Sequence, residues 1–145
     1  MLEKMKALVK EKDICVLSTV SEGARPHCSL MAYVADEKCR EIYMATHSTT
    51  KKYKNLLHNS SASLLIDSRE ITPRLQAQAL TVSGVFQPIE DAHKRARVEA
   101  LLLRQHPHLK DFVKNPNTIM ICIKVQSFLL LNGLTDSHFV NLKEI

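Results

Sequence analysis

Short runs of apolar and β-branched residues, each of strand length, constrain the fold of this 145-residue chain most strongly. The first run covers residues 14–20, and the turn residues Ser21-Glu22-Gly23-Ala24 separate it from a second run at residues 26–34. In the second run, one set of side chains (Cys28, Leu30, Ala32 and Val34) alternates with another (His27, Ser29, Met31 and Tyr33). This period of two indicates a strand with two different faces. Because the connection is so short, we expect the two strands to pair antiparallel.

A third strand is predicted at residues 40–46, so that the first three strands form a meander. The other predicted strands cover residues 62–66, 80–86 and 118–131, with an edge strand at 138–142. The predicted helices cover residues 1–12 and 90–105, with a short helix around 109–113. One more helix begins after Ser48 or Thr49 and closes at Asn59. In the helix over 90–105 we expect Ala92, Ala96, Ala100 and Leu103 to line one face. This order predicts one mainly β (α+β) domain over residues 1–145, a six-stranded antiparallel barrel with flanking helices.

The composition limits how a phosphate group can be held. The chain contains only 3 glycines, and neither G-x-G-x-x-G nor G-x-x-x-x-G-K-[ST] occurs. A cofactor phosphate must therefore be bound without a glycine-rich loop. The net charge of +5 permits an anionic ligand or a nucleic acid but requires neither.

The sequence also bears on the compartment. No stretch approaches 18 apolar residues, and the charged first 12 residues lack the apolar region of a signal peptide. None of the four cysteines forms a C-x-x-C pair, which fits a reducing environment. These observations predict a cytoplasmic protein with no membrane partner.

Cysteine and histidine give no pattern of metal ligands. Cys15, Cys28 and Cys122 lie in apolar runs and are expected to be small buried core residues. His106 and His108 flank a proline, and we prefer a helix end to a metal site as their explanation, because a ligand set needs further converging residues. No metal is predicted.

The segment from Ala45 to Lys52 joins the third strand to the following helix and is the most informative part of the chain. A helix N-terminus offers unpaired backbone N–H groups and partial positive charge, and here hydroxyl and ammonium groups lie beside it. Such a segment can hold phosphate without glycine. The alternative is an ordinary capped helix with solvated lysines.

Five segments occur in an order that resembles a known family. They are residues 23–27 (GARPH), 42–46 (IYMAT) with the Thr50-Lys51-Lys52 turn, 52–56 (KYKNL), 63–66 (SLLI) and 80–84 (LTVSG). In this order the chain resembles the flavin-binding split-barrel family related to pyridoxamine 5′-phosphate oxidase, over roughly residues 10–90.

The resemblance implies a split barrel, bound FMN and a homodimer with cofactor sites between the two barrels. It implies that Lys51 and Lys52, with Thr50 before them, hold the FMN phosphate. Ala45 and Thr46 would lie along the flavin and its ribityl chain. The outward-facing Ser29 and Met31 would border the isoalloxazine ring.

Four departures from the family pattern argue against oxidation of pyridoxamine 5′-phosphate itself. True oxidases of this vitamin have Arg, Lys and Gln at the positions that Ser29, Val34 and Ala79 occupy here. Their C-terminal tryptophan has no counterpart in a chain without Trp.

Three functions therefore stay open. The first is an FMN-dependent oxidoreductase that acts on a small-molecule substrate or electron donor. The second is a non-catalytic carrier of flavin or haem, or a stress-related binding module, and a deazaflavin could replace FMN. The third, which we favour least, is a barrel that binds nucleic acid. The sequence identifies no catalytic residue.

Overall fold

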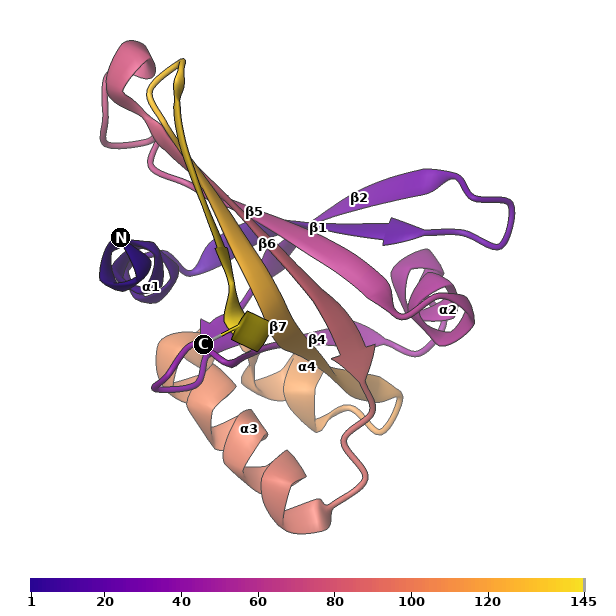
Figure 1. The fold of residues 1–145 in the computed structure, drawn as a ribbon. Helices are drawn as coiled ribbons and strands as arrows, with labels where there is room; N and C mark the ends of the chain where they lie inside the picture. The colour runs from indigo at the N-terminus through magenta and orange to yellow at the C-terminus, as the bar shows by residue number, and fades with distance from the viewer. Residues whose placement is uncertain (145) are drawn as a thin grey trace.

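The computed structural model describes residues 1–144 and shows a curled antiparallel sheet with helices around it (Figure 1). The helices are α1 (Leu2–Glu11), α2 (Lys51–His58), α3 (Ala92–Gln105) and α4 (Lys110–Lys114), with short 3₁₀ turns η1 (Arg74–Gln76), η2 (Pro107–Leu109) and η3 (Leu142–Glu144). The strands are β1 (Ile14–Val20), β2 (Pro26–Ala32), β3 (Val34–Ala35), β4 (Glu41–His47), β5 (Ser61–Asp67), β6 (Gln78–Gln87), β7 (Thr118–Asn132) and β8 (Asp136–Asn141).

The strand order in the sheet is β2-β1-β5-β6-β7-β4-β3, and β8 pairs with β7. All pairings are antiparallel. The predicted strands and the mainly β split-barrel class are confirmed. Between Ser83 and Gly84 the β6–β7 register shifts, and a Cβ atom on Gly84 would lie only 2.3 Å from the carbonyl oxygen of Lys124. Glycine at this position therefore allows the two backbones to approach closely.

The predicted meander of the first three strands holds only in part, because the run over residues 26–34 is interrupted: its β2 part pairs with β1 and only its two-residue β3 part pairs with β4. Tyr33 separates β2 from β3: its N–H still donates to Asp13 O (2.9 Å), opposite it in the β1–β2 register, but its carbonyl oxygen lies 2.9 Å from the His106 ring instead. The short β3 then pairs with β4 at only two positions, Val34 with Tyr43 and Ala35 with Ile42. The main partner of β4 is β7, and the two strands pair at seven consecutive positions of β4. As a result the sheet stays split between β2 and β4.

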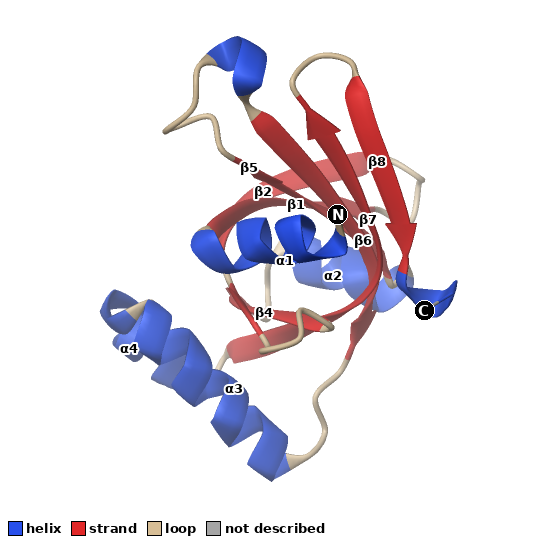
Figure 2. Cartoon of the chain, turned by 60° about the vertical axis from the view of Figure 1, so that its left-hand side comes forward, coloured by secondary structure: helices blue, strands red, loops and turns tan. Residues whose placement is uncertain are grey.

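The core lies inside the curl of the sheet (Figure 2). α1 lies across one opening and contributes Met5, Leu8 and Val9, and α2 contributes Leu56. A buried hydrogen bond from Asn55 Nδ2 to Thr19 Oγ1 (3.0 Å) joins α2 to β1. α3 and α4 pack outside the barrel, where Val98, Leu102 and Val113 meet Tyr43, Met120 and Cys122 of β4 and β7.

Three local predictions are corrected. The N-cap of α2 is Thr50 rather than Ser48 or Thr49, and Asn59 is its C-cap as predicted. Ala92, Ala96 and Ala100 of α3 are exposed, because Val98 and Leu102 bury more apolar surface against the sheet. Cys28 is exposed, since it lies on the outer face of an edge strand, while Cys15 and Cys122 are buried as expected.

Candidate functional site

A hollow of about 270 Å³ lies at the split in the sheet. Residues 30–32 of β2 form one wall and residues 45–47 of β4 form another. In the described part of the chain, β2 pairs only with β1, and these residues of β4 pair only with β7. Each strand therefore turns an unpaired backbone edge toward the split. The lining residues are Leu30, Met31, Ala32, Ala45, Thr46, His47, Thr50, Lys52, Leu109 and Phe112.

The N-terminus of α2 supplies positive charge at this hollow. The first internal bond of the helix runs from Lys54 N to Thr50 O (3.2 Å), and the N–H groups of Lys51, Lys52 and Tyr53 find no acceptor among residues 1–144. No acidic side chain occupies the first turn, and neither lysine pairs with a carboxylate among the described residues. Free N–H groups and unpaired ammonium groups favour a bound anion.

The hydroxyl groups beside this N-terminus are already engaged. Thr50 Oγ1 donates to His47 O (3.0 Å) and lies 2.9 Å from Thr46 Oγ1. Since the Thr50 proton is used, Thr46 donates to Thr50. The two threonines therefore hold the strand end against the helix start and leave the donor role toward an anion to the backbone and the lysines.

Five of the seven predicted site residues line the hollow: Met31, Ala45, Thr46, Thr50 and Lys52. Lys51 lies outside the lining, exposed on the same first turn of α2. Ser29 does not line it either. The predicted outward orientation of the Ser29–Met31 face is wrong, because Met31 is 8% exposed in the core and Leu30, on the opposite face, is 73% exposed. The curl of the sheet reverses which face of this edge strand is covered.

A helical wall was absent from the prediction. Leu109 of η2 and Phe112 of α4 close the hollow from a segment that lies 57 or more residues after the other lining residues, and His47 of β4 also lines it. The spacing of the apolar residues Leu109 and Phe112 predicts a short helix, but nothing in the local sequence indicates that Phe112 faces a cavity. The side chain of Phe112 is 39% exposed, as expected for a residue that lines an open site.

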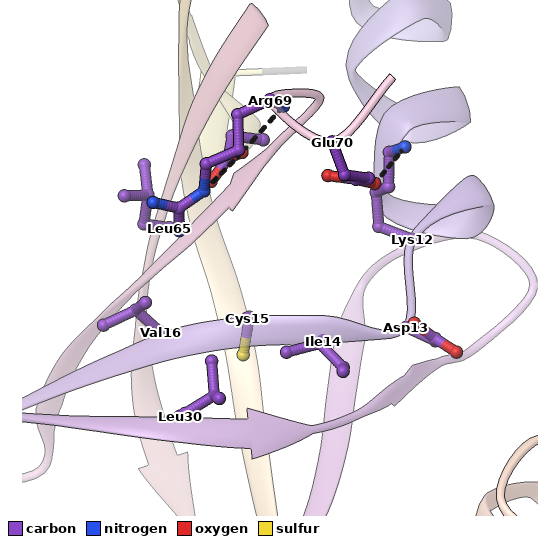
Figure 3. Close-up of a pocket in the computed structure, with 10 residues that line it drawn as sticks. Lys12, Asp13, Ile14, Cys15, Val16, Leu30, Leu65, Arg69 and Glu70 are labelled. Carbon is purple, nitrogen blue, oxygen red and sulfur yellow. Dashed lines mark hydrogen bonds and ion pairs between the residues drawn. The ribbon is translucent and has the colours of Figure 1, made fainter. Parts of the chain in front are cut away.

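A second hollow, of about 340 Å³, lies on the outer face of the sheet near the end of α1 (Figure 3). Its floor is apolar, with Ile14, Val16, Leu30 and Leu65. Four of the five charged side chains in its lining are paired, Lys12 with Glu70 (2.6 Å) and Arg69 with Asp67 (3.1 Å), and the fifth, Asp13, is a carboxylate. With paired charges it offers an anion less than the hollow at α2, and only Leu30 is shared by the two.

The side chains with shifted pKa values are structural. Burial raises the pKa of the Cys15 and Cys122 thiols to about 12, so neither is a ready nucleophile. Burial would raise the pKa of Glu41, but hydrogen bonds from Tyr43 (2.7 Å) and Lys94 (3.0 Å) outweigh it and lower that pKa. This cluster ties α3 to β4 and lies away from both hollows.

The described residues contain neither a metal-binding cluster nor a membrane-spanning helix. Within residues 1–144, no three His, Cys, Asp or Glu side chains are grouped closely enough to hold a metal ion. Over the same residues, no helix is both long enough and apolar enough to span a bilayer.

The curled sheet, the split and the helical flanks define a split β-barrel (Figure 2). The sequence model of the pyridoxamine 5′-phosphate oxidase family matches residues 1–132, and the chain belongs to that family. No protein with a curated description matches it.

Solved structures share this fold at low sequence identity. A heme-binding protein from Mycobacterium smegmatis superposes with a TM-score of 0.85 at 19% identity over 96% of this chain, which spans only 57% of that protein. General stress protein 26 from Bacillus anthracis superposes with a TM-score of 0.72 at 22% identity, with 97% of each chain covered. The heme storage protein HutZ from Vibrio cholerae superposes with a TM-score of 0.75 at 17% identity, and the match covers 90% of this chain and 93% of that one.

Proposed function

We propose that this protein binds a planar anionic cofactor, haem or flavin, at the split and serves as a carrier of that cofactor. The observation that supports the proposal best is the hollow between the free edges of β2 and β4, with the N-terminus of α2, which has no side-chain cap hydrogen bond, at one side. Lys52 and the free N–H groups would receive the anionic end of the cofactor. Met31, Leu109 and Phe112 provide apolar surface for its ring system.

Both cofactors fit the donor set. The phosphate of FMN suits the N–H groups and lysines at α2, and haem propionates could use the same charges. His47 lines the hollow and can supply an imidazole nitrogen to haem iron, since only its Nδ1 has a described partner, Thr49 Oγ1 at 3.2 Å. The similar proteins from Mycobacterium smegmatis and Vibrio cholerae are described as heme-binding and heme storage proteins, which favours haem.

An FMN-dependent oxidoreductase is the second candidate, because the family is that of an FMN-using type of oxidase and the Thr50-Lys51-Lys52 turn suits a phosphate. In that case the flavin supplies the redox chemistry, and the chain binds and orients it. The lining contains no carboxylate or thiol to act as an acid or base. We do not propose pyridoxamine 5′-phosphate oxidation, given Ser29, Val34 and Ala79.

We further propose a homodimer that covers the outer face of the sheet. Directly paired positions place Leu30, Val16, Leu65, Thr81, Leu129 and Phe139 in one continuous uncharged row across six strands. Leu30 is 73% and Phe139 63% exposed, which is unusual for apolar side chains in so regular a row. Because Leu30 also lines the hollow, a partner on this row would lie beside the cofactor site.

The carrier proposal is tested by titrating the purified protein with hemin and, separately, with FMN. We expect a Soret band shift or quenching of flavin fluorescence that saturates at one cofactor per chain. Turnover of NADH or NADPH by the loaded protein would instead support the oxidoreductase. Failure of both cofactors at micromolar concentration, with salt-sensitive binding of single-stranded DNA, would support the nucleic-acid alternative.

A further inference from the structure

His106 lies at the end of α3 and reaches the point where the strand β2–β3 is interrupted. Its ring is buried, 3% exposed, and Nε2 lies 2.9 Å from the carbonyl oxygen of Tyr33 across 73 residues of sequence. Because a carbonyl oxygen only accepts, Nε2 carries the proton. Tyr33 is itself buried, and the tyrosine carbonyl has left the strand ladder at this point. The imidazole therefore satisfies a buried acceptor that the interruption creates.

This hydrogen bond joins two of the walls of the hollow, the β2 wall and the helical wall. On the Tyr33 side, the preceding residues are the β2 wall, residues 30–32. On the His106 side, the following residues are the helical wall with Leu109 and Phe112. Leu109 N also donates to His106 O (3.0 Å), so the wall begins at the histidine's own carbonyl. The far end is held separately, where Thr118 Oγ1 donates to Phe112 O (2.6 Å).

We propose that His106 is a positioning residue that sets how closely the helical wall approaches β2 and thereby controls cofactor binding at the split. The inference rests on the proposed function for its ligand, but the wall geometry can be measured without any ligand. Without the hydrogen bond, the Tyr33 carbonyl is left buried and unsatisfied, and water entering to solvate it would separate the two walls.

The test uses the length of the side chain at position 106. In His106→Gln the amide nitrogen lies as many bonds from Cβ as Nε2 does, so it can reach the Tyr33 carbonyl. His106→Asn carries the same amide two bonds from Cβ and falls short, and His106→Leu has no donor. His108→Leu is the matched control, since His108 is exposed, two residues away, and touches only the edge of the His106 ring (centroids 5.9 Å).

Because the chain has no tryptophan, Phe112→Trp introduces a single reporter into the wall. In the cofactor-free protein, we expect His106→Asn to raise acrylamide quenching of this indole at least twofold, and His106→Gln and His108→Leu to leave it unchanged. Without the reporter, haem or FMN affinity should fall roughly tenfold in His106→Asn and recover to within about threefold of the parent in His106→Gln.

The outcomes separate the two proposals. Unchanged quenching and affinity in a folded His106→Asn variant would overturn the positioning role. Equal effects of Gln and Asn would also overturn it, because the donor would then not matter. If His106→Leu fails to fold, the comparison of His106→Asn with His106→Gln still tests the positioning role. Changed quenching with no cofactor binding even in the parent protein would support the positioning role and reject the carrier.

Discussion

Thr46 Oγ1 donates to Thr50 Oγ1 at 2.9 Å, and this bond fixes the end of β4 against the start of α2. Thr46 is 3% exposed and Thr50 is half-buried, so the bond is partly shielded from water. It holds the first turn of α2 at the split, where Thr50 and Lys52 line the hollow. The anion-binding end of the site is therefore built by a strand-to-helix corner.

Loss of this bond should weaken the fold. We expect Thr46→Val, which keeps the side-chain volume but removes the hydroxyl, to lower the free energy of unfolding by about 1 kcal/mol. Thr49→Val is the control, because Thr49 is exposed and should change stability by under about 0.5 kcal/mol. Urea denaturation measures both, and equal stability of the two variants would contradict the assigned role of Thr46.

Removal of both lysines at α2 should weaken cofactor binding. We expect Lys51→Ala with Lys52→Ala to reduce affinity for FMN or hemin by roughly tenfold at low salt, since two charges near a helix N-terminus contribute about 1–2 kcal/mol together. Lys54→Ala is the control on the same helix, because Lys54 is exposed and does not line the hollow. Fluorescence or Soret titration measures the affinities. An equal loss in the Lys54 variant would mean that only net charge matters.

Gly84 should not tolerate a side chain. Gly84→Ala places a methyl group 2.3 Å from Lys124 O and 2.9 Å from Ile123 Cγ2, so we expect a loss of at least about 2 kcal/mol of unfolding free energy. Gly23→Ala is the control, because nothing lies within 4 Å of its added methyl group. Thermal and chemical unfolding should show a loss only at Gly84. A fully stable Gly84 variant would show that β6 and β7 are less close than described.

The pH dependence of stability should report the Glu41 cluster. The pKa of Glu41 is lowered in the folded protein by the bonds from Tyr43 and Lys94, which outweigh burial. The resulting stabilisation is therefore complete above the usual glutamate value of about 4.3 and is lost as pH falls through the lower folded value. We expect Glu41→Gln to flatten the fall in unfolding free energy between about pH 5 and 3, and Glu37→Gln, on an exposed turn, to leave it in place. An identical slope in the parent and the Glu41 variant would contradict this.

A charge in the exposed row should prevent dimer formation. We expect Leu129→Glu to convert a dimer to a monomer in analytical ultracentrifugation, because an unpaired carboxylate at an interface centre is costly to desolvate. Leu57→Glu is the control, an exposed leucine on α2 outside the row (61% exposed, against 43% for Leu129). A parent protein that is monomeric at high micromolar concentration would already exclude the interface.

Much of the fold could be predicted from local patterns. Alternation and turn residues located every long strand, and Asn59 and His106-Pro107 located two helix ends, because caps and prolines act through neighbouring backbone. The same local pattern indicates a positively charged helix start at Thr50 and Lys52, but only the family resemblance assigns these residues to a cofactor phosphate. The break at Tyr33 was not predictable, since its partners Val9, Asp13 and His106 come from other elements.

The sequence by itself determined the antiparallel strands, the helix that begins after Thr50 and the positive charge at its first turn, because these depend on residues within a few positions of one another. Only the tertiary structure decided which face of β2 is covered, that Met31 is buried and Leu30 exposed, and that Phe112 forms a wall of the site. Those properties depend on how the sheet curls and where α4 packs. Contacts between residues far apart in the chain set both, and no local pattern encodes them.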